Sequence, residues 1–145
     1  MKSELENSHI LQKADSLICR LLLVEDDPVA QDVTKLFLKN TCEVEIAKDG
    51  YEALQKVNSS RYDAILMDIN LGSGMNGIES VKKIREVAGY ETTPIVALTA
   101  YAMKGDKENF LAAGCTHYLS KPFDKKSLIE LIKQIFFGDD LQEFV

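Results

Sequence analysis

Residues 21–30 read LLLVEDDPVA, in which four aliphatic residues lead directly into three adjacent acids, Glu25, Asp26 and Asp27, and then into Pro28. An uninterrupted apolar run predicts a strand that is buried on both faces, as in a parallel sheet covered by helices. Asp27 can cap a helix that has Pro28 in its first turn. The acids therefore lie at the carboxyl end of a strand, where their mutual repulsion calls for a positively charged partner.

Short apolar runs alternate with amphipathic stretches along the chain. They predict strands at residues 19–24, 42–47, 62–67, 94–98 and 117–119, and helices at residues 28–40, 50–57, 76–89, 104–114 and 124–138. The apolar residues that share one face of the first helix are Val29, Val33, Leu36 and Phe37. Asn76 is expected to cap the third helix and Gly89 to end it. Five strand–helix units predict an α/β fold, a parallel sheet with helices on both faces.

The 145 residues, of which 46% are hydrophobic, fit a single domain. We place this domain at residues 18–138, with a tail or linker at residues 1–17 and a short tail at residues 139–145. The formal net charge is −6, and the sequence has no basic block. Nucleic acid and anionic membrane surfaces are therefore poor candidates for partners, because both require clustered Lys and Arg.

The cysteines Cys19, Cys42 and Cys115 are far apart in the sequence and form no CxxC pair, so neither a zinc motif nor a disulfide framework is indicated. We expect three reduced thiols, buried or partly buried. The N-terminus has acids where a signal peptide needs an apolar stretch, and no segment is apolar over the length of a membrane span. These features favour a cytoplasmic protein.

Polar residues follow the predicted strands at the edge where parallel strands end together, which is where sites form in such sheets. They are Glu25, Asp26 and Asp27 after the first strand, Asp68 after the third, Thr99 after the fourth and Lys121 after the fifth. A hard divalent cation would relieve the repulsion among these carboxylates. Mg²⁺ is the preferred candidate because it binds oxygen ligands, with Mn²⁺ as an alternative.

The segments LLLVEDD, AILMDIN, ALTA and YLSKPF, in this order and spacing, resemble the receiver domain of two-component response regulators over about residues 19–137. Receivers associated with hybrid sensor kinases are the most similar type. The resemblance implies a flavodoxin-like, doubly wound sheet of order 2-1-3-4-5. It also implies a function, in which a histidine kinase or a histidine-phosphotransfer protein donates a phosphoryl group from phosphohistidine. The domain would catalyse this transfer and its own slow dephosphorylation without being an enzyme in the ordinary sense.

The resemblance assigns a role to each residue at the edge of the sheet. Asp68 is implied as the phosphoryl acceptor, Thr99 and Lys121 as the groups that contact the phosphoryl oxygens, and Glu25, Asp26, Asp68 and the backbone carbonyl of Asn70 as the Mg²⁺ site. Asp26 would bind the metal directly and Glu25 mainly through water. The peptide bond between Lys121 and Pro122 is expected to be cis.

Output is implied to follow either conformational switching or onward relay of the phosphoryl group. In a switch, Thr99 would move toward the phosphoryl group and Tyr118 would rotate inward, although Tyr101 lies near the same route. The affected surface comprises the fourth helix, the fifth strand and the fifth helix, and bears Ala102 and Met103. This surface is a candidate for homodimerisation or for binding a target.

The sequence alone leaves three other interpretations of the function open. A haloacid-dehalogenase-like phosphotransferase would need a second Asp two residues after the nucleophile, where this chain has Asn70. A flavodoxin would need a loop that accepts phosphate, which the acids after the first strand would repel. A pseudo-receiver that only binds a partner would not need the complete set of acids, hydroxyl and lysine. Individually, Thr99 can be a helix cap, Tyr118 a core residue and Lys121 a surface lysine.

The loop DINLGSGMNG, residues 68–77, is one residue longer than the common receiver pattern, and Gly72 and Gly74 make its path more permissive. We expect this departure to affect the rate of dephosphorylation rather than the site of phosphorylation. Only seven residues follow Gly138, so no DNA-binding output domain is expected in this chain. A stand-alone receiver and a fragment of a hybrid histidine kinase both fit.

Overall fold

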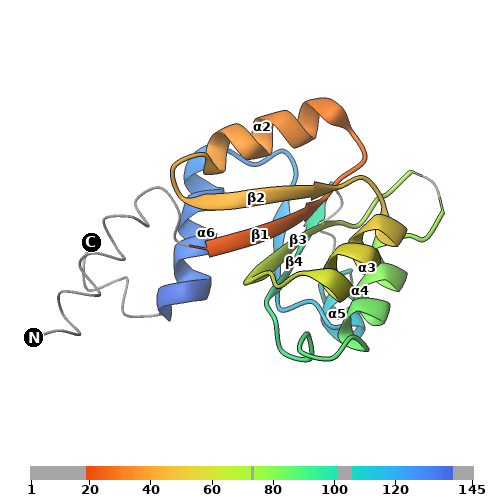
Figure 1. Cartoon of the computed structure of the whole chain (residues 1–145). Helices are drawn as coiled ribbons and strands as arrows, with labels where there is room; N and C mark the ends of the chain where they lie inside the picture. Colours follow the sequence, from red (N-terminus) through yellow and green to blue (C-terminus); the bar gives the residue numbers. More distant parts are fainter. Residues whose placement is uncertain (1–18, 73, 101–105, 139–145) are drawn as a thin grey trace, which may run out of the picture.

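The computed structural model of the chain (Figure 1) describes residues 19–72, 74–100 and 106–138. The strands are β1 (Cys19–Val24), β2 (Cys42–Ala47), β3 (Ala64–Asp68), β4 (Ile95–Thr99) and β5 (His117–Ser120). The helices are α2 (Pro28–Leu38), α3 (Gly50–Ser59), α4 (Gly77–Arg85), α5 (Asp106–Ala113) and α6 (Lys125–Phe137). All strand pairs are parallel and the order is β2-β1-β3-β4-β5, which confirms the predicted flavodoxin-like sheet.

The register of the strands brings their carboxyl ends level with one another. Val24 pairs with Met67 in the β1–β3 ladder, so the residue after Val24 lies beside Asp68. On the other side of the sheet, Thr99 pairs with Ser120 at the ends of β4 and β5. As a result, the polar residues at the carboxyl ends of four different strands lie together at one edge of the sheet.

The two faces of the sheet are covered by different helices, as Figure 1 shows. Leu21 and Leu23 of β1 face the side covered by α2 and α6, where they join Leu38, Leu128 and Ile132 in one buried cluster. The alternate residues of β1 face a second cluster, which α3, α4 and α5 cover. Because β1 is buried on both faces, its sequence is apolar throughout, as its pattern predicted.

Side chains at the helix starts supply the backbone hydrogen bonds that a first turn lacks. Asp27 caps α2 by accepting hydrogen bonds from two backbone amides, and Pro28 occupies the first turn. Asn76 caps α4 and forms a reciprocal capping box with Glu79. Both caps confirm predictions from the sequence, and both fix where the chain leaves the functional edge of the sheet.

Helix α2 turns a different face to the sheet from the one that three of its four predicted apolar residues indicate, and the fourth, Phe37, is half-buried against the cluster under α2 and α6. Val29 is 68% exposed, Val33 41% and Leu36 66%, whereas Thr34 and Leu38 are buried. The Gln31 side chain donates a hydrogen bond of 2.6 Å to the backbone carbonyl of Glu25 and so fixes the rotation of α2 at its start. The buried stripe therefore follows Gln31, and an apolar stripe remains on the surface.

Helix α4 ends at Arg85, before the predicted end at Gly89. The cause is Tyr90, which is buried and donates a hydrogen bond of 2.7 Å to the backbone carbonyl of Ser60. The Arg85 side chain also donates to the carbonyls of Tyr90 and Gly114. These contacts draw the chain into the core before another helical turn can form, and Gly89 instead supplies a positive φ of 94° in the turn that follows.

Candidate functional site

Three carboxylates converge at the carboxyl edge of the sheet. Glu25, Asp26 and Asp68 each offer an oxygen, and these oxygens lie within 4.8 Å of one another. Glu25 and Asp68 are buried, with 2% and 4% exposure, while Asp26 is exposed. Several carboxylate oxygens around one point, one of them open to water, suit a hard divalent cation such as Mg²⁺, which keeps part of its hydration shell. The acidic cluster can therefore hold the metal that the sequence predicted.

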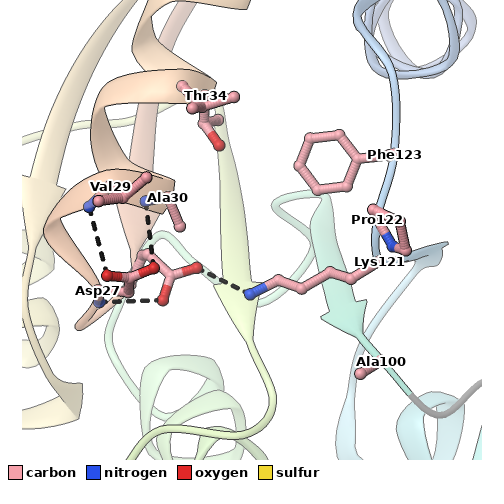
Figure 2. A pocket seen from close by; sticks show the side chains of 10 residues that line it. Asp27, Val29, Ala30, Thr34, Ala100, Lys121, Pro122 and Phe123 are labelled. Atoms are coloured by element: carbon pink, nitrogen blue, oxygen red, sulfur yellow. Dashed lines mark hydrogen bonds and ion pairs between the residues drawn. The ribbon is translucent and has the colours of Figure 1, made fainter.

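Lys121 supplies the positive charge that the acids require. Its Nζ lies 2.8 Å from Oε1 of Glu25 and 3.5 Å from Oδ1 of Asp68. Figure 2 shows Lys121 extending across the site toward a carboxylate beside Asp27. The side chain of Lys121 is only 27% exposed, so it is not a solvated surface lysine.

The charges of this cluster shift one another's protonation. Burial, together with the neighbouring charge of Asp68, raises the pKa of Glu25 even though the hydrogen bond from Lys121 opposes the shift. Burial lowers the pKa of Lys121, but the hydrogen bond to Glu25 and the charge of Asp68 outweigh it, so the net direction is upward. Lys121 is therefore a cation at neutral pH, and the raised pKa of Glu25 favours protonation of this carboxylate on acidification.

Backbone amides of the loop after β3 orient two of the acids. The amide of Asn70 donates to Oδ1 of Asp68 at 3.0 Å, and the amide of Gly72 donates to Oδ2 of Asp26 at 2.8 Å. A Cβ at Gly72 would lie 2.8 Å from the same Asp26 oxygen. The site-orienting role of Gly72 was not predicted, and its only signal in the sequence is a glycine close behind the acceptor strand.

Thr99 and Lys121 are joined through the backbone at the ends of β4 and β5. Thr99 is buried, and its carbonyl accepts a hydrogen bond of 2.7 Å from the amide of Lys121. The peptide bond between Lys121 and Pro122 is cis, as predicted. The structure thus places Thr99 next to the strand end from which Lys121 reaches the acids.

An open cleft of about 430 Å³ lies beside the charged cluster (Figure 2). Its walls include Val29 and Val33 from α2 and Pro122 and Phe123 from the segment after β5, and Lys121 lies in its lining. The cleft therefore connects the exposed apolar stripe of α2 with the acids. A partner seated on α2 would have direct access to the site.

Tyr118 lies on β5, apart from the charged cluster. It is 39% exposed, so it is not a core residue, and Nζ of Lys107 lies 5.4 Å from the centroid of its ring. Such a cation–π contact favours the outward position of the ring. The neighbouring residues Tyr101, Ala102 and Met103, which the sequence placed on the same surface, fall outside the described residues.

Comparison with known proteins agrees with this geometry. Residues 21–133 match the family model of the response regulator receiver domain. The chain belongs to this family. It is a receiver domain of two-component signalling. The haloacid-dehalogenase-like and flavodoxin alternatives do not explain why the acids, the hydroxyl of Thr99 and Lys121 all lie at one edge of the sheet.

Two solved structures illustrate how closely the receiver domain follows its relatives. The receiver domain of the sensor histidine kinase PA1611 from Pseudomonas aeruginosa, solved with a magnesium ion coordinated in its active site cleft, is 39% identical, with a TM-score of 0.73 over 80% of this chain and 95% of that one. The chemotaxis protein CheY4 from Vibrio cholerae is 34% identical, with a TM-score of 0.76 over 79% of this chain and 96% of that one.

Relatives by sequence include much longer proteins. Hybrid signal transduction histidine kinase I of Dictyostelium discoideum is 41% identical over 121 residues, and the histidine-protein kinase BarA of Escherichia coli is 32% identical over 117 residues. These matches cover 78% and 80% of this chain but only 7% and 13% of the two kinases. Within the part of the chain that the structure describes, none of the helices has the length and apolar character needed to cross a bilayer.

Proposed function

We propose that this receiver domain, which we place at residues 18–138, accepts a phosphoryl group from a phosphohistidine onto Asp68. The observation that carries the proposal is the position of the Lys121 ammonium, 2.8 Å from Glu25 and 3.5 Å from Asp68 at the edge of a three-carboxylate cluster. A buried carboxylate beside the ammonium of a lysine, a flexible type of side chain, is suited to a change of partner, because the same ammonium can pair with a carboxylate oxygen or with a phosphoryl oxygen. After transfer, the ammonium can pair with a phosphoryl oxygen where it previously paired with Asp68.

In the proposed reaction, a carboxylate oxygen of Asp68 attacks phosphorus, and the bond between phosphorus and the histidine nitrogen breaks with its electron pair left on the imidazole. Most of the catalysis is positioning and neutralisation of charge, as is general for phosphoryl transfer. Lys121 neutralises one phosphoryl oxygen, and the hydroxyl of Thr99 donates a hydrogen bond to another. The amide of Asn70 holds the attacking carboxylate in place from 3.0 Å.

A divalent cation, when bound, supplies further positive charge for the phosphoryl oxygens. Asp26, Asp68 and the backbone carbonyl of Asn70 would hold it, with Glu25 acting mainly through water. These different roles agree with the exposure of the two side chains, because Asp26 is open to solvent whereas Glu25 is buried and hydrogen-bonded to Lys121.

The donor is proposed to be a histidine kinase or a histidine-phosphotransfer protein that docks over the cleft beside Lys121. Val29, Val33 and Leu36 expose an apolar stripe on α2, two of these residues line the cleft, and the cleft opens onto the acids. A helix that carries the phosphohistidine can bury this stripe while its imidazole enters the cleft. A setting in the cytoplasm and an origin as part of a hybrid kinase are also proposed, and the second is supported by the two long kinases that this chain matches over 7% and 13% of their length.

The output is proposed to follow either a switch or a relay. In the switch, phosphate on Asp68 draws Thr99 toward it, and Tyr118 leaves Lys107 and rotates inward, which changes the surface of α5, β5 and α6 that is a candidate for dimerisation. In the relay, Asp68 passes its phosphoryl group to another histidine, and Tyr118 keeps its outward position.

The test is incubation with acetyl phosphate and Mg²⁺, followed by intact mass and by mapping of the modified peptide. We expect one phosphoryl group on Asp68, and none when EDTA removes the metal. Asp68→Asn should abolish the mass shift. Asp32→Asn is the matched control, because it removes an exposed carboxylate from α2 and should leave phosphorylation intact. Equal modification of Asp68→Asn and the wild type would show that Asp68 is not the acceptor.

A further inference from the structure

The two cysteines Cys19 and Cys42 form a pair at the end of the sheet that is opposite to the charged cluster. Cys19 begins β1 and Cys42 begins β2, and the two residues are direct partners in the parallel ladder. Their Sγ atoms lie 2.7 Å apart and share a hydrogen bond. Both side chains are buried, at 7% and 3% exposure, in the cluster that α2 and α6 cover.

This placement meets the geometric requirements of a disulfide. Neighbouring strands are about 4.8 Å apart, and Cα separations of about 4.4–6.8 Å accommodate a disulfide. The sulfur atoms, at 2.7 Å, need to approach by less than an ångström to reach the bonded distance of about 2.05 Å. The third cysteine, Cys115, lies in the cluster on the other face of the sheet and cannot compete for either partner.

We infer that Cys19 and Cys42 are a modification site, at which a hydroperoxide such as hydrogen peroxide forms an intramolecular disulfide between β1 and β2. In the first step one sulfur takes an oxygen from the peroxide to become a sulfenic acid, and one water is released. In the second step the other sulfur attacks it, the S–S bond forms and a second water leaves. The balance is two thiols and one peroxide, which give one disulfide and two waters.

The surroundings of the pair determine how fast the bond forms. The hydrogen bond with Cys42 and burial raise the pKa of the Cys19 thiol. Because the thiolate is the reactive form, oxidation is slow, on the scale of hours at the upper end of the usual range. Burial also shields the disulfide from reducing agents, so the bond persists once it has formed and does not respond rapidly to changes in redox conditions.

The bond would fix an edge strand covalently to the strand that carries the acids. β2 lies at one edge of the sheet and has β1 as its only neighbour within the described residues. Cys19 and Cys42 are 23 residues apart, and closing a loop of this length restricts the unfolded chain. We expect the melting temperature to rise by about 10 °C on oxidation, from the loop-entropy model and the entropy of unfolding of a domain of this size.

The experiment treats the whole chain with hydrogen peroxide for hours, unfolds it in guanidinium chloride, alkylates the remaining thiols with N-ethylmaleimide and maps tryptic peptides without reduction. We expect a mass loss of two hydrogens, and a cross-link between the peptides 14–20 and 40–48, which hold Cys19 and Cys42. Cys115 should be alkylated. The melting temperature should rise in the wild type and in Cys115→Ala, and should not rise in Cys42→Ala.

The result that overturns the inference is a peptide map with no link between Cys19 and Cys42. Added oxygen on either residue without a link, a link to Cys115, or a link between two chains each has this meaning. The map of the wild type settles the question even where Cys42→Ala fails to fold. The outcome is independent of the proposed function, because no phosphodonor is present and Asp68→Asn should form the same cross-link.

Discussion

Replacing Lys121 with Met should destabilise the metal-free protein by about 3–5 kcal/mol at neutral pH, which is the usual cost of removing one partner from a buried ion pair. At an effective dielectric constant of about 20, the attraction of Lys121 to Glu25 across 2.8 Å is about 6 kcal/mol, and that to Asp68 across 3.5 Å is about 5 kcal/mol. Much of this gross attraction offsets the desolvation of the three groups. Its loss leaves two buried carboxylates that repel each other.

The repulsion that remains can be bounded from the same geometry. The offered oxygens of Glu25 and Asp68 are at most 4.8 Å apart, so their repulsion is at least about 3.5 kcal/mol at the same dielectric constant. Met keeps the length and the apolar stem of Lys121, so packing is largely preserved. The comparison therefore isolates the charge, and Lys83→Met, which removes an exposed lysine of α4, is the control that should change stability by less than about 0.5 kcal/mol.

The assay is urea unfolding of both variants and the wild type at pH 7 and pH 5, with and without Mg²⁺. The folded-state pKa of Glu25 is already raised above its ordinary value. A raised carboxyl pKa contributes stability below the ordinary value of about 4.3, and this contribution is lost as pH rises through the folded pKa. Without Lys121 the pKa of Glu25 should rise further, so the deficit of Lys121→Met should shrink at pH 5. A deficit that is the same at both pH values, and that Mg²⁺ does not reduce, would refute the electrostatic account.

Three further predictions follow from the same structure. Asp26→Ala should weaken Mg²⁺ binding at least tenfold, as measured by titration calorimetry. Asp27→Ala should leave the Mg²⁺ affinity unchanged and should lower stability by about 1 kcal/mol, because it removes the cap of α2. Equal loss of affinity in the two variants would contradict the assignment of Asp26 as a metal ligand. Gly77→Ala should lower stability by about 1–3 kcal/mol in urea unfolding, because its Cβ would lie 2.6 Å from backbone atoms at the end of β3, and an unchanged unfolding midpoint would be contrary to this packing. Fluorotyrosine spectra should show Tyr118 moving on addition of beryllofluoride, and moving more readily in Lys107→Gln, which lacks the cation over its ring; identical spectra in both states would favour relay over switching.

The sequence was sufficient to predict the parts of the fold that depend on local pattern. β1 is apolar throughout because it is buried on both faces, and Asp27 and Asn76 cap helices because short polar side chains can satisfy free amides. The site was predictable for a related reason. Parallel strands end at one edge, so Glu25, Asp68 and Lys121 had to converge once the strands were identified.

The remaining features depend on contacts between distant segments, which periodicity does not encode. The apolar residues Val29 and Leu36 are exposed because the hydrogen bond from Gln31 fixes the rotation of α2. The proximity of Cys19 and Cys42 follows from the register between β1 and β2, and no CxxC motif in the sequence indicates it. Both features could be identified only in the three-dimensional structure, because the sequence pattern of one helix or strand does not specify how that element is rotated or aligned against its neighbours.

The ion pair between Lys121 and Glu25 also has a consequence for how the chain acquires its site during synthesis. The two residues are 96 positions apart, so the contact joins the first strand to the segment that follows the last one. Long-range contacts of this kind form late, since the intervening chain must first be ordered, and an emerging polypeptide presents its N-terminal segments first. A nascent or C-terminally truncated chain therefore carries an acidic cluster without its internal cation. The buried carboxylates of Glu25 and Asp68 therefore gain the ammonium that neutralises them only when the last strand and the segment after it are in place.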